Sequence, residues 1–421
     1  MSDNVPMGSF PADFLWGAAS ASYQTEGGNE GSALAGGWER ARGWEPCGAA
    51  CGSWERFDED LRCLERLGAK AYRFSLEWSR VEPRPGEFDE AALARYEDWT
   101  RRLLGAGIEP VVTLHHFSEP AWLLREHPRG WTDPGFGVRF AAYAARAADV
   151  LAPRVRWWTT LNEPLVFAVM AYGAGLFPPG RRLMIGPSRE FRKVLVPALA
   201  RAHVDARNII KNRRPDAMVS IAHHVGELLP ARPGDEAAVE RWDRLFHRDI
   251  LDLLKGELDY LGLNYYTRVF VATPRFPFFP VNSLPGYAEF ERGLGPRLFR
   301  LLGGVRGDLP RNDMDWEISP DSFGRVVSRL WTETGLPLLI TENGVPDARG
   351  VLREDFLRSH LRALRGAMDG GAEVLGYLHW SLTDNWEWGS YRPRFGLFDR
   401  ERRPAAGAEY YARVCRTGDP G

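Results

Sequence analysis

Short apolar, strand-like runs alternate with helical stretches along most of the chain, and this alternation constrains the fold more than any other feature. Parallel strands need long crossover connections, so eight such runs separated mostly by helices predict a closed (β/α)8 TIM barrel. The predicted strands are residues 14–20, 71–78, 109–117, 156–164, 218–225, 260–267, 337–344 and 374–382.

Helical periodicity fills the intervening stretches, and several of them end in Gly or Pro. A doubly wound sheet would give fewer units and usually a glycine-rich phosphate turn, and no such turn follows the first strand. No domain boundary is visible, so residues 1–421 are interpreted as a single (β/α)8 domain. The predicted helices are residues 57–67, 91–105, 136–151, 194–212, 236–254, 320–333 and 356–368.

Two segments do not fit the repeat and are predicted to be long loops on the catalytic face of the barrel. Residues 26–52 follow the first strand, and residues 272–310 follow the sixth. Their prolines and glycines argue against a simple helix, and loops of this length are usually functional. The second loop contains Phe-Pro-Phe-Phe-Pro at residues 276–280. We expect this apolar run to be a packed lid or an oligomer contact.

Composition and charge exclude several classes of function. A formal net charge of −2 gives no general surface for nucleic acid or anionic membranes. No apolar run approaches the length of a membrane span, and the first residues lack a signal pattern, so a cytoplasmic protein is expected. The sequence leaves a homo-oligomer open.

Cysteine and histidine patterns indicate neither a disulfide scaffold nor a metal site. The four cysteines are interpreted as free thiols, with a local bridge between Cys47 and Cys51 as the lesser alternative. The nine histidines show no ligand spacing of the H-E-x-x-H kind. We therefore expect neither a metal nor an organic cofactor.

Two glutamates end strand-like runs, and each has an amide side chain beside it. Glu163 lies in Thr-Leu-Asn-Glu-Pro, and Glu342 lies in Ile-Thr-Glu-Asn-Gly. Either could be a solvated surface acid. In a barrel, however, chemistry is presented at the carboxyl ends of the strands, and two glutamates from different strands there are the equipment for cleaving a glycosidic bond.

Several motifs, in order along residues 10–399, resemble glycoside hydrolase family 1, whose members are retaining β-glycosidases with a barrel fold. Besides the two glutamate segments, the motifs are Phe-Leu-Trp-Gly at 14–17, Tyr-Gln-Thr-Glu-Gly at 23–27, Tyr-Arg-Phe-Ser-Leu-Glu-Trp-Ser-Arg at 72–80 and Asp-Asn-Trp-Glu-Trp at 384–388.

The resemblance implies a role for each residue near the reacting bond. Glu163 would be the acid/base and Glu342 the nucleophile, with their carboxyls about 5–5.5 Å apart. Arg73 would keep Glu342 ionised, which suits an arginine placed within a strand. Tyr266 would donate a hydrogen bond to Glu342, although a packed barrel tyrosine is the alternative. Asn162 would bind the sugar 2-hydroxyl.

The resemblance also implies a substrate pocket. Trp380 would lie beneath the terminal sugar, and Trp316 would lie on the leaving-group side. The carboxylate of Glu387 would repel a phosphate, so unphosphorylated sugars are expected. The residues that would bind the sugar hydroxyls are Gln24, His116, Asn162, Glu387 and Trp388.

The family motifs are not all intact. The usual His-Trp-Asp-Leu-Pro reads His-Phe-Ser-Glu-Pro at residues 116–120, and Glu77 replaces a more frequent serine. Both changes leave the two carboxylates alone and bear on substrate preference.

The resemblance implies a retaining exo-β-glycosidase acting on β-glucosides, and also on β-galactosides or β-fucosides. Two alternatives stay open. A transglycosylase would use the same covalent intermediate with an alcohol or lipid acceptor bound near residues 276–280. A non-catalytic sugar-binding barrel would typically lose a catalytic glutamate, and this chain keeps both.

Overall fold

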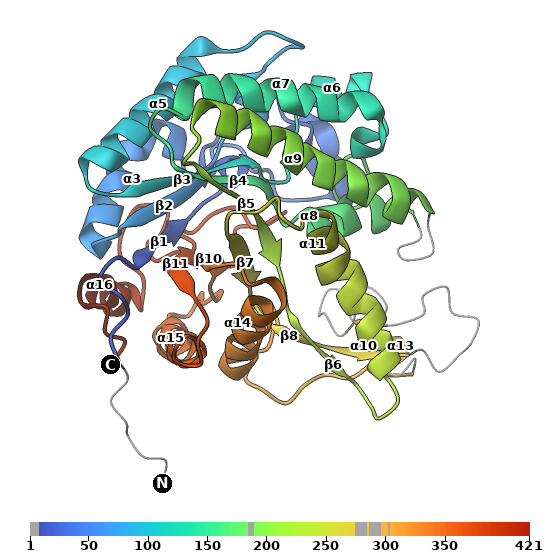
Figure 1. Cartoon of the computed structure of the whole chain (residues 1–421), viewed down its shortest axis with the longest axis vertical. Coiled ribbons are helices and arrows are strands. Elements are labelled where there is room, and N and C mark those ends of the chain that lie inside the picture. Colours follow the sequence, from blue (N-terminus) through green and yellow to red (C-terminus); the bar gives the residue numbers. More distant parts are fainter. Residues whose placement is uncertain (1–7, 184–188, 274–283, 286–295, 302–303) are drawn as a thin grey trace.

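Eight parallel strands close into a barrel in the computed structural model, which describes residues 8–183, 189–273, 284–285, 296–301 and 304–421 (Figure 1). The strand order around the barrel is β1-β11-β10-β7-β5-β4-β3-β2, so strands that follow one another in the chain are neighbours. All eight predicted strands are barrel strands. Their bounds are β1 Leu15–Ala19, β2 Ala71–Ser75, β3 Glu109–His115, β4 Trp157–Asn162, β5 Met218–His224, β7 Leu261–Tyr265, β10 Leu338–Asn343 and β11 Val374–Trp380.

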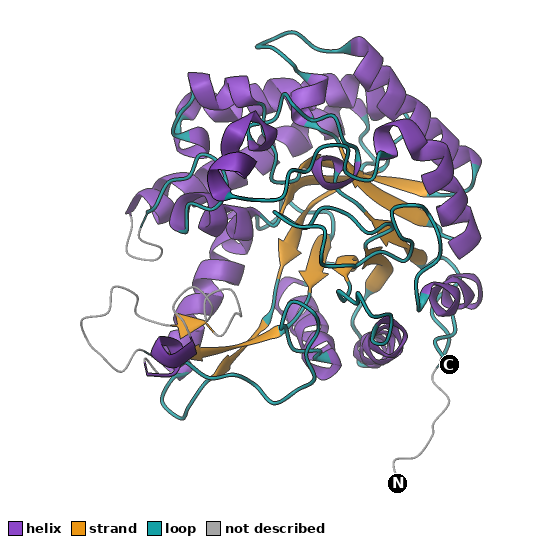
Figure 2. Ribbon diagram, turned by 180° about the vertical axis from the view of Figure 1, so that it is seen from behind, coloured by secondary structure: helices purple, strands orange, loops and turns teal. Residues whose placement is uncertain are grey.

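Helices surround the barrel, as Figure 2 shows with helices in purple around the orange strands. The longer helices are α3 Ser53–Leu67, α5 Glu90–Gly105, α7 Pro134–Leu151, α9 Val196–Arg213, α10 Glu236–Asp243, α14 Pro320–Thr334, α15 Arg353–Asp369 and α16 Ala408–Thr417. The shorter ones are α1 Ser22–Thr25, α2 Glu39–Arg42, α4 Trp78–Val81, α6 Ala121–Glu126, α8 Pro164–Ala168, α11 Asp249–Leu253 and α13 Pro296–Leu301.

Local sequence chemistry fixes where several of these helices begin and end. The Asp89 carboxylate accepts hydrogen bonds from the backbone N–H groups of Ala91 and Ala92, both at 2.9 Å, and so starts α5. Asp133 followed by a proline starts α7 in a similar way. Helix α3 ends at Gly68, whose φ of 70° suits a residue without a Cβ.

Helix α7 illustrates how an apolar stripe attaches a helix to the barrel. Phe136, Phe140, Tyr143 and Ala147 recur at helical spacing and are buried, whereas Val138 on another face is 70% exposed. Full burial of one phenylalanine contributes about 1.5–3 kcal/mol. Such stripes hold the helices on the barrel, and the strand ends thereby keep a fixed position.

A second, three-stranded sheet lies beside the barrel and was not predicted. It contains β6 Glu227–Pro230, β8 Arg268–Ala272 and β9 Leu284–Pro285, with β6 parallel and β9 antiparallel to β8. The loop predicted over residues 272–310 begins where β8 ends, and a short helix, α13, lies within it. Residues 276–280 lie outside the described residues.

Three further details differ from the sequence-based expectation. The helix expected over residues 236–254 is divided into α10, a π-helical segment (Arg244–Arg248) and α11. The loop expected over residues 26–52 contains a short helical turn over Leu34–Trp38, which is kinked at Gly36 and Gly37 and is followed by α2. Helix α16 was missed, although its buried face repeats at helical spacing.

The four cysteines are free, as predicted from their number and spacing, and all four are buried. The thiols of Cys47 and Cys51 both face backbone carbonyl oxygens, those of Tyr23 at 3.1 Å and Asp384 at 2.9 Å. None of the described helices combines the length and the apolar character needed to cross a membrane.

Candidate active site

The backbone places both glutamates at the carboxyl end of the barrel strands. Glu163 directly follows β4, and Glu342 lies near the end of β10. Glu163 has a left-handed conformation with φ of 42°, and its N–H donates to the carbonyl of Ala222 at 2.7 Å. This turn ends the strand and starts α8 at Pro164, whose ring suits a first helical position. Both carboxyls are nearly buried.

Arg73 lies at the centre of the site and is fully buried in β2. One terminal nitrogen lies 2.5 Å from Glu342 Oε1, and the other donates to Asn162 Oδ1 at 2.7 Å. Its Nε donates to the hydroxyl of Thr113 at 3.0 Å. A buried guanidinium needs such partners, and the predicted pairing of Arg73 with Glu342 is present.

The second oxygen of Glu342 accepts a hydrogen bond from the Tyr266 hydroxyl at 2.6 Å. Burial and the neighbouring charge of Glu163 together raise the pKa of Glu342 to about 7, against the lowering effect of Arg73 and Tyr266. The charge of Glu163 therefore lies within electrostatic reach of Glu342. Arg73 and Tyr266 favour the ionised form of Glu342.

Glu163 has different surroundings. Its Oε1 accepts a hydrogen bond from Asn264 Nδ2 at 2.8 Å and lies 3.6 Å from His224 Nδ1. No arginine or lysine in the described part of the chain forms an ion pair with it. Asn264 also donates to Asn162 Oδ1 at 3.2 Å, so a continuous chain of hydrogen bonds runs from Glu163 through both amides and Arg73 to the other carboxylate.

Three rings line one wall of the site. The ring of His116 lies parallel to those of Trp380 and Trp388, with centroids 5.8 and 6.2 Å away and interplanar angles of 14° and 11°. Its Nε2 lies 3.3 Å from Asn162 Nδ2, while its Nδ1 is buried without a hydrogen-bond partner among the described residues. Burial lowers the pKa of His116 well below its usual value, so the imidazole is neutral. A neutral ring can use Nδ1 toward a bound hydroxyl.

Glu387 is attached to the same wall by a hydrogen bond from the indole N–H of Trp380 to its Oε1, at 2.9 Å. Burial and the charge of Glu342 together raise the pKa of Glu387 to about 8. Glu387 thus lies beside Trp380, the predicted platform, and within electrostatic reach of Glu342.

Gln24 lies in α1 and is fully buried. Its amide nitrogen donates to Asn385 Oδ1 at 3.0 Å and to the carbonyl of Trp386 at 2.9 Å, and its Oε1 has no partner among the described residues. The side chain is therefore oriented by its nitrogen, and the oxygen is available to a ligand.

Trp316 belongs to a different part of the site. Its ring packs against Tyr266, with centroids 5.6 Å apart, and against Phe395 at 6.4 Å. The structure thus brings it close to the tyrosine that contacts Glu342, in the same apolar cluster as Trp380.

Sequence reasoning missed Asn264 and His224, two side chains that contact Glu163. Both lie at strand ends: His224 is the last residue of β5, and Asn264 is the penultimate residue of β7. Polar residues at the ends of predicted barrel strands were the available signal. The glycine at position 344, two residues after Glu342, is required by packing, because a Cβ there would lie 1.9 Å from the carbonyl oxygen of Trp380.

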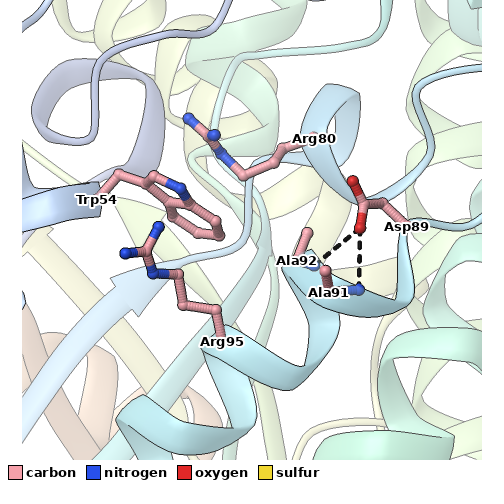
Figure 3. A pocket seen from close by; sticks show the side chains of 6 residues that line it. All are labelled: Trp54, Arg80, Asp89, Ala91, Ala92 and Arg95. Carbon is pink, nitrogen blue, oxygen red and sulfur yellow. Dashed lines mark hydrogen bonds between the residues drawn. The ribbon is translucent and has the colours of Figure 1, made fainter.

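A separate pocket lies outside this site, between α3, α4 and α5 (Figure 3). The guanidinium groups of Arg80 and Arg95 lie over the ring of Trp54, at 4.0 and 4.7 Å from its centroid. Arg80 also bonds to Glu26 and Arg95 to Glu55, so the charges of both are paired within the protein. None of the predicted site residues lines this pocket.

A family model described as glycosyl hydrolase family 1 matches residues 7–252 and 242–419, nearly the whole chain. The chain belongs to glycosyl hydrolase family 1. It is therefore a glycosidase, as its sequence motifs predicted, and its barrel is the fold expected from them.

Relatives of known activity and structure cover the chain almost completely. A bifunctional β-D-glucosidase/β-D-fucosidase from Bifidobacterium breve is 32% identical over 92% of this chain and 93% of its own length. A β-galactosidase from Pyrococcus woesei is 28% identical over 93% and 92%. The solved structure of a β-glycosidase from Pyrococcus horikoshii covers 99% of this chain and 96% of its own, at 29% identity and a TM-score of 0.85.

The contact between Tyr266 and Glu342 makes a prediction about pH. The Tyr266 hydroxyl lowers the pKa of Glu342, so Tyr266→Phe should raise it and shift the acid limb of the pH–kcat/KM profile to higher pH. A hydrogen bond to a charged group corresponds to a shift of about one pH unit. The profile is measured on an aryl β-glucoside. An unmoved acid limb would show that this hydrogen bond does not control the ionisation of Glu342.

Proposed function

We propose that this glycosidase is a retaining exo-β-glycosidase that works through a covalent glycosyl-enzyme intermediate. The observation that carries the proposal is the difference between the surroundings of the two carboxyls. Glu342 contacts a guanidinium and a phenol, which favour its ionised form, whereas Glu163 contacts an amide and an imidazole. An ionised nucleophile and a protonated acid are what a retaining mechanism needs.

In the proposed first step, Glu342 attacks the anomeric carbon while Glu163 gives its proton to the departing oxygen, and the glycosidic C–O bond breaks. In the second step, Glu163, now ionised, takes a proton from water, which attacks the same carbon and releases Glu342. Each carboxyl returns to its starting state. Asn162 lies between them and is bonded to Arg73, which suits a contact to the 2-hydroxyl.

The substrate we propose is a terminal, unphosphorylated β-glucoside, with β-galactosides and β-fucosides as further substrates. The names of the relatives support these sugars. Nδ1 of His116 and Oε1 of Gln24 have no partners among the described residues and are suited to sugar hydroxyls, and the Glu387 carboxyl on the same wall can bind hydroxyls as well.

Water is the acceptor that we propose. The alternative of an alcohol or lipid acceptor uses the same intermediate and depended on residues 276–280, which lie outside the described residues. Product analysis with and without an added alcohol separates hydrolysis from transglycosylation.

Removing Glu342 should abolish hydrolysis and allow a chemical rescue. For Glu342→Gly we expect a loss of at least about 10³-fold in kcat on aryl β-glucosides. Added azide should then restore turnover and give the α-glycosyl azide, because it attacks from the face that the nucleophile has left. Wild-type turnover by this variant, with its fold verified by circular dichroism, would contradict the nucleophile assignment.

The loss of activity on removing Glu163 should depend on the leaving group of the substrate. For Glu163→Ala we expect poor leaving groups to lose about 10²–10⁴-fold in kcat/KM and activated dinitrophenyl glycosides to lose far less, since only a basic oxygen needs the proton. Azide should here give the β-glycosyl azide, the opposite product from Glu342→Gly. Equal losses across the series would remove Glu163 from the role of the acid.

Removing Glu387 should affect binding and turnover together. For Glu387→Ala we expect KM to rise and kcat to fall, with kcat/KM down by about 10-fold or more, because contacts to remote hydroxyls help to hold the distorted sugar. Glu387→Gln serves as a matched control that replaces the carboxyl by an amide of the same shape and keeps an acceptor oxygen. Steady-state kinetics unchanged in both variants would place Glu387 outside the sugar site.

A further inference from the structure

His224 is an ionisable side chain that contacts Glu163, and the mechanism proposed above gives it no role. It is the last residue of β5, and its Nδ1 lies 3.6 Å from Glu163 Oε1. Its ring packs almost parallel to that of Tyr266, with centroids 6.2 Å apart and an interplanar angle of 18°. His224 therefore contacts the surroundings of both glutamates.

The backbone fixes the position of His224. It is paired in register with Asn264 of β7, the residue whose amide donates to Glu163, and the next N–H donates to the carbonyl of Asn264 at 3.1 Å. The preceding residue, His223, is buried and contacts the carbonyl of His247 at 3.0 Å. Successive side chains of a strand point to opposite faces, so His223 anchors the outer face while His224 turns inward.

The proposed mechanism changes the charge of Glu163 once in each half of the cycle. Before the glycosidic bond breaks, Glu163 carries a proton. Afterwards it is an anion, while Glu342 is neutral because it forms an ester with the sugar. In the described structure the carboxyl receives one hydrogen bond, from Asn264. An anion buried to this extent favours a second donor.

We propose that His224 is a positioning residue that donates its Nδ1–H to Glu163 once Glu163 has lost its proton. At 3.6 Å the two atoms are beyond hydrogen-bond distance, and a shift of less than about 1 Å brings them within it. The proton of Glu163 goes to the departing oxygen, and His224 keeps its own proton throughout. The contact thus stabilises the product side of the bond-breaking step. This inference rests on the proposed function, because it assigns the acid to Glu163.

Two variants separate the hydrogen bond from the packing. His224→Phe removes the donor and keeps a ring against Tyr266. His224→Asn replaces the ring but keeps an amide N–H near the position of Nδ1. Both are assayed against a series of aryl β-glucosides whose leaving groups range from dinitrophenol to unsubstituted phenol and alkyl alcohols.

For His224→Phe we expect kcat/KM to fall about tenfold on the poorest leaving groups and less than about twofold on the dinitrophenyl glucoside. The dependence of kcat/KM on leaving-group basicity should become steeper, and His224→Asn should restore most of the wild-type slope. A structural role alone does not move this slope, because it changes all substrates alike.

A uniform loss across the series in both variants, or a change confined to KM, would overturn the proposal and make His224 an aglycone contact or a packing residue. An error in the proposed retaining mechanism itself would give a different result. In that case Glu342→Gly and Glu163→Ala would not give glycosyl azides of opposite configuration, whatever the His224 variants did.

Discussion

The rest of the site depends on one buried cation, the guanidinium of Arg73. It has no exposed surface, and removal of such a charge from water costs several kcal/mol unless its partners offset that cost. The partners come from three other strands: Glu342 on β10, Asn162 on β4 and Thr113 on β3. These strands meet around one side chain only when the barrel closes, so closure of the fold and assembly of the site are a single event.

The same cation makes the two glutamates unequal. It contacts one carboxylate directly and reaches the other only through two amides, Asn162 and Asn264, which are polar but uncharged. Amides fix the position of Glu163 without fixing its charge. A group that must bind and release a proton in every cycle benefits from partners of this kind, and one that must stay ionised benefits from an arginine.

Much of the barrel and of the site was predictable because local sequence patterns indicate it. All eight barrel strands were predicted from the alternating pattern. The pairing of Arg73 with Glu342 was predicted from the resemblance to the family, and an arginine within an apolar strand requires an acid in any case. The sequence could not distinguish Asn264 and His224 from other polar residues at strand ends. Their position beside Glu163 arises from the register between β5 and β7, which no single segment of sequence contains. The additional sheet was missed for a similar reason: its strands are short, and among the described residues β6 pairs with β8 and β8 pairs with β9, outside the barrel.

The left-handed backbone at Glu163 has a consequence for how such a chain changes over time. A side chain with a Cβ in this conformation costs roughly 1–2 kcal/mol, and glycine is the residue that avoids the cost. The protein thus keeps an acid where conformation alone would select glycine. Glu163 is the acid of the proposed mechanism, so selection for thermal stability without selection for turnover would tend to remove it. The stability of the fold and the proposed chemistry therefore oppose each other at this one position.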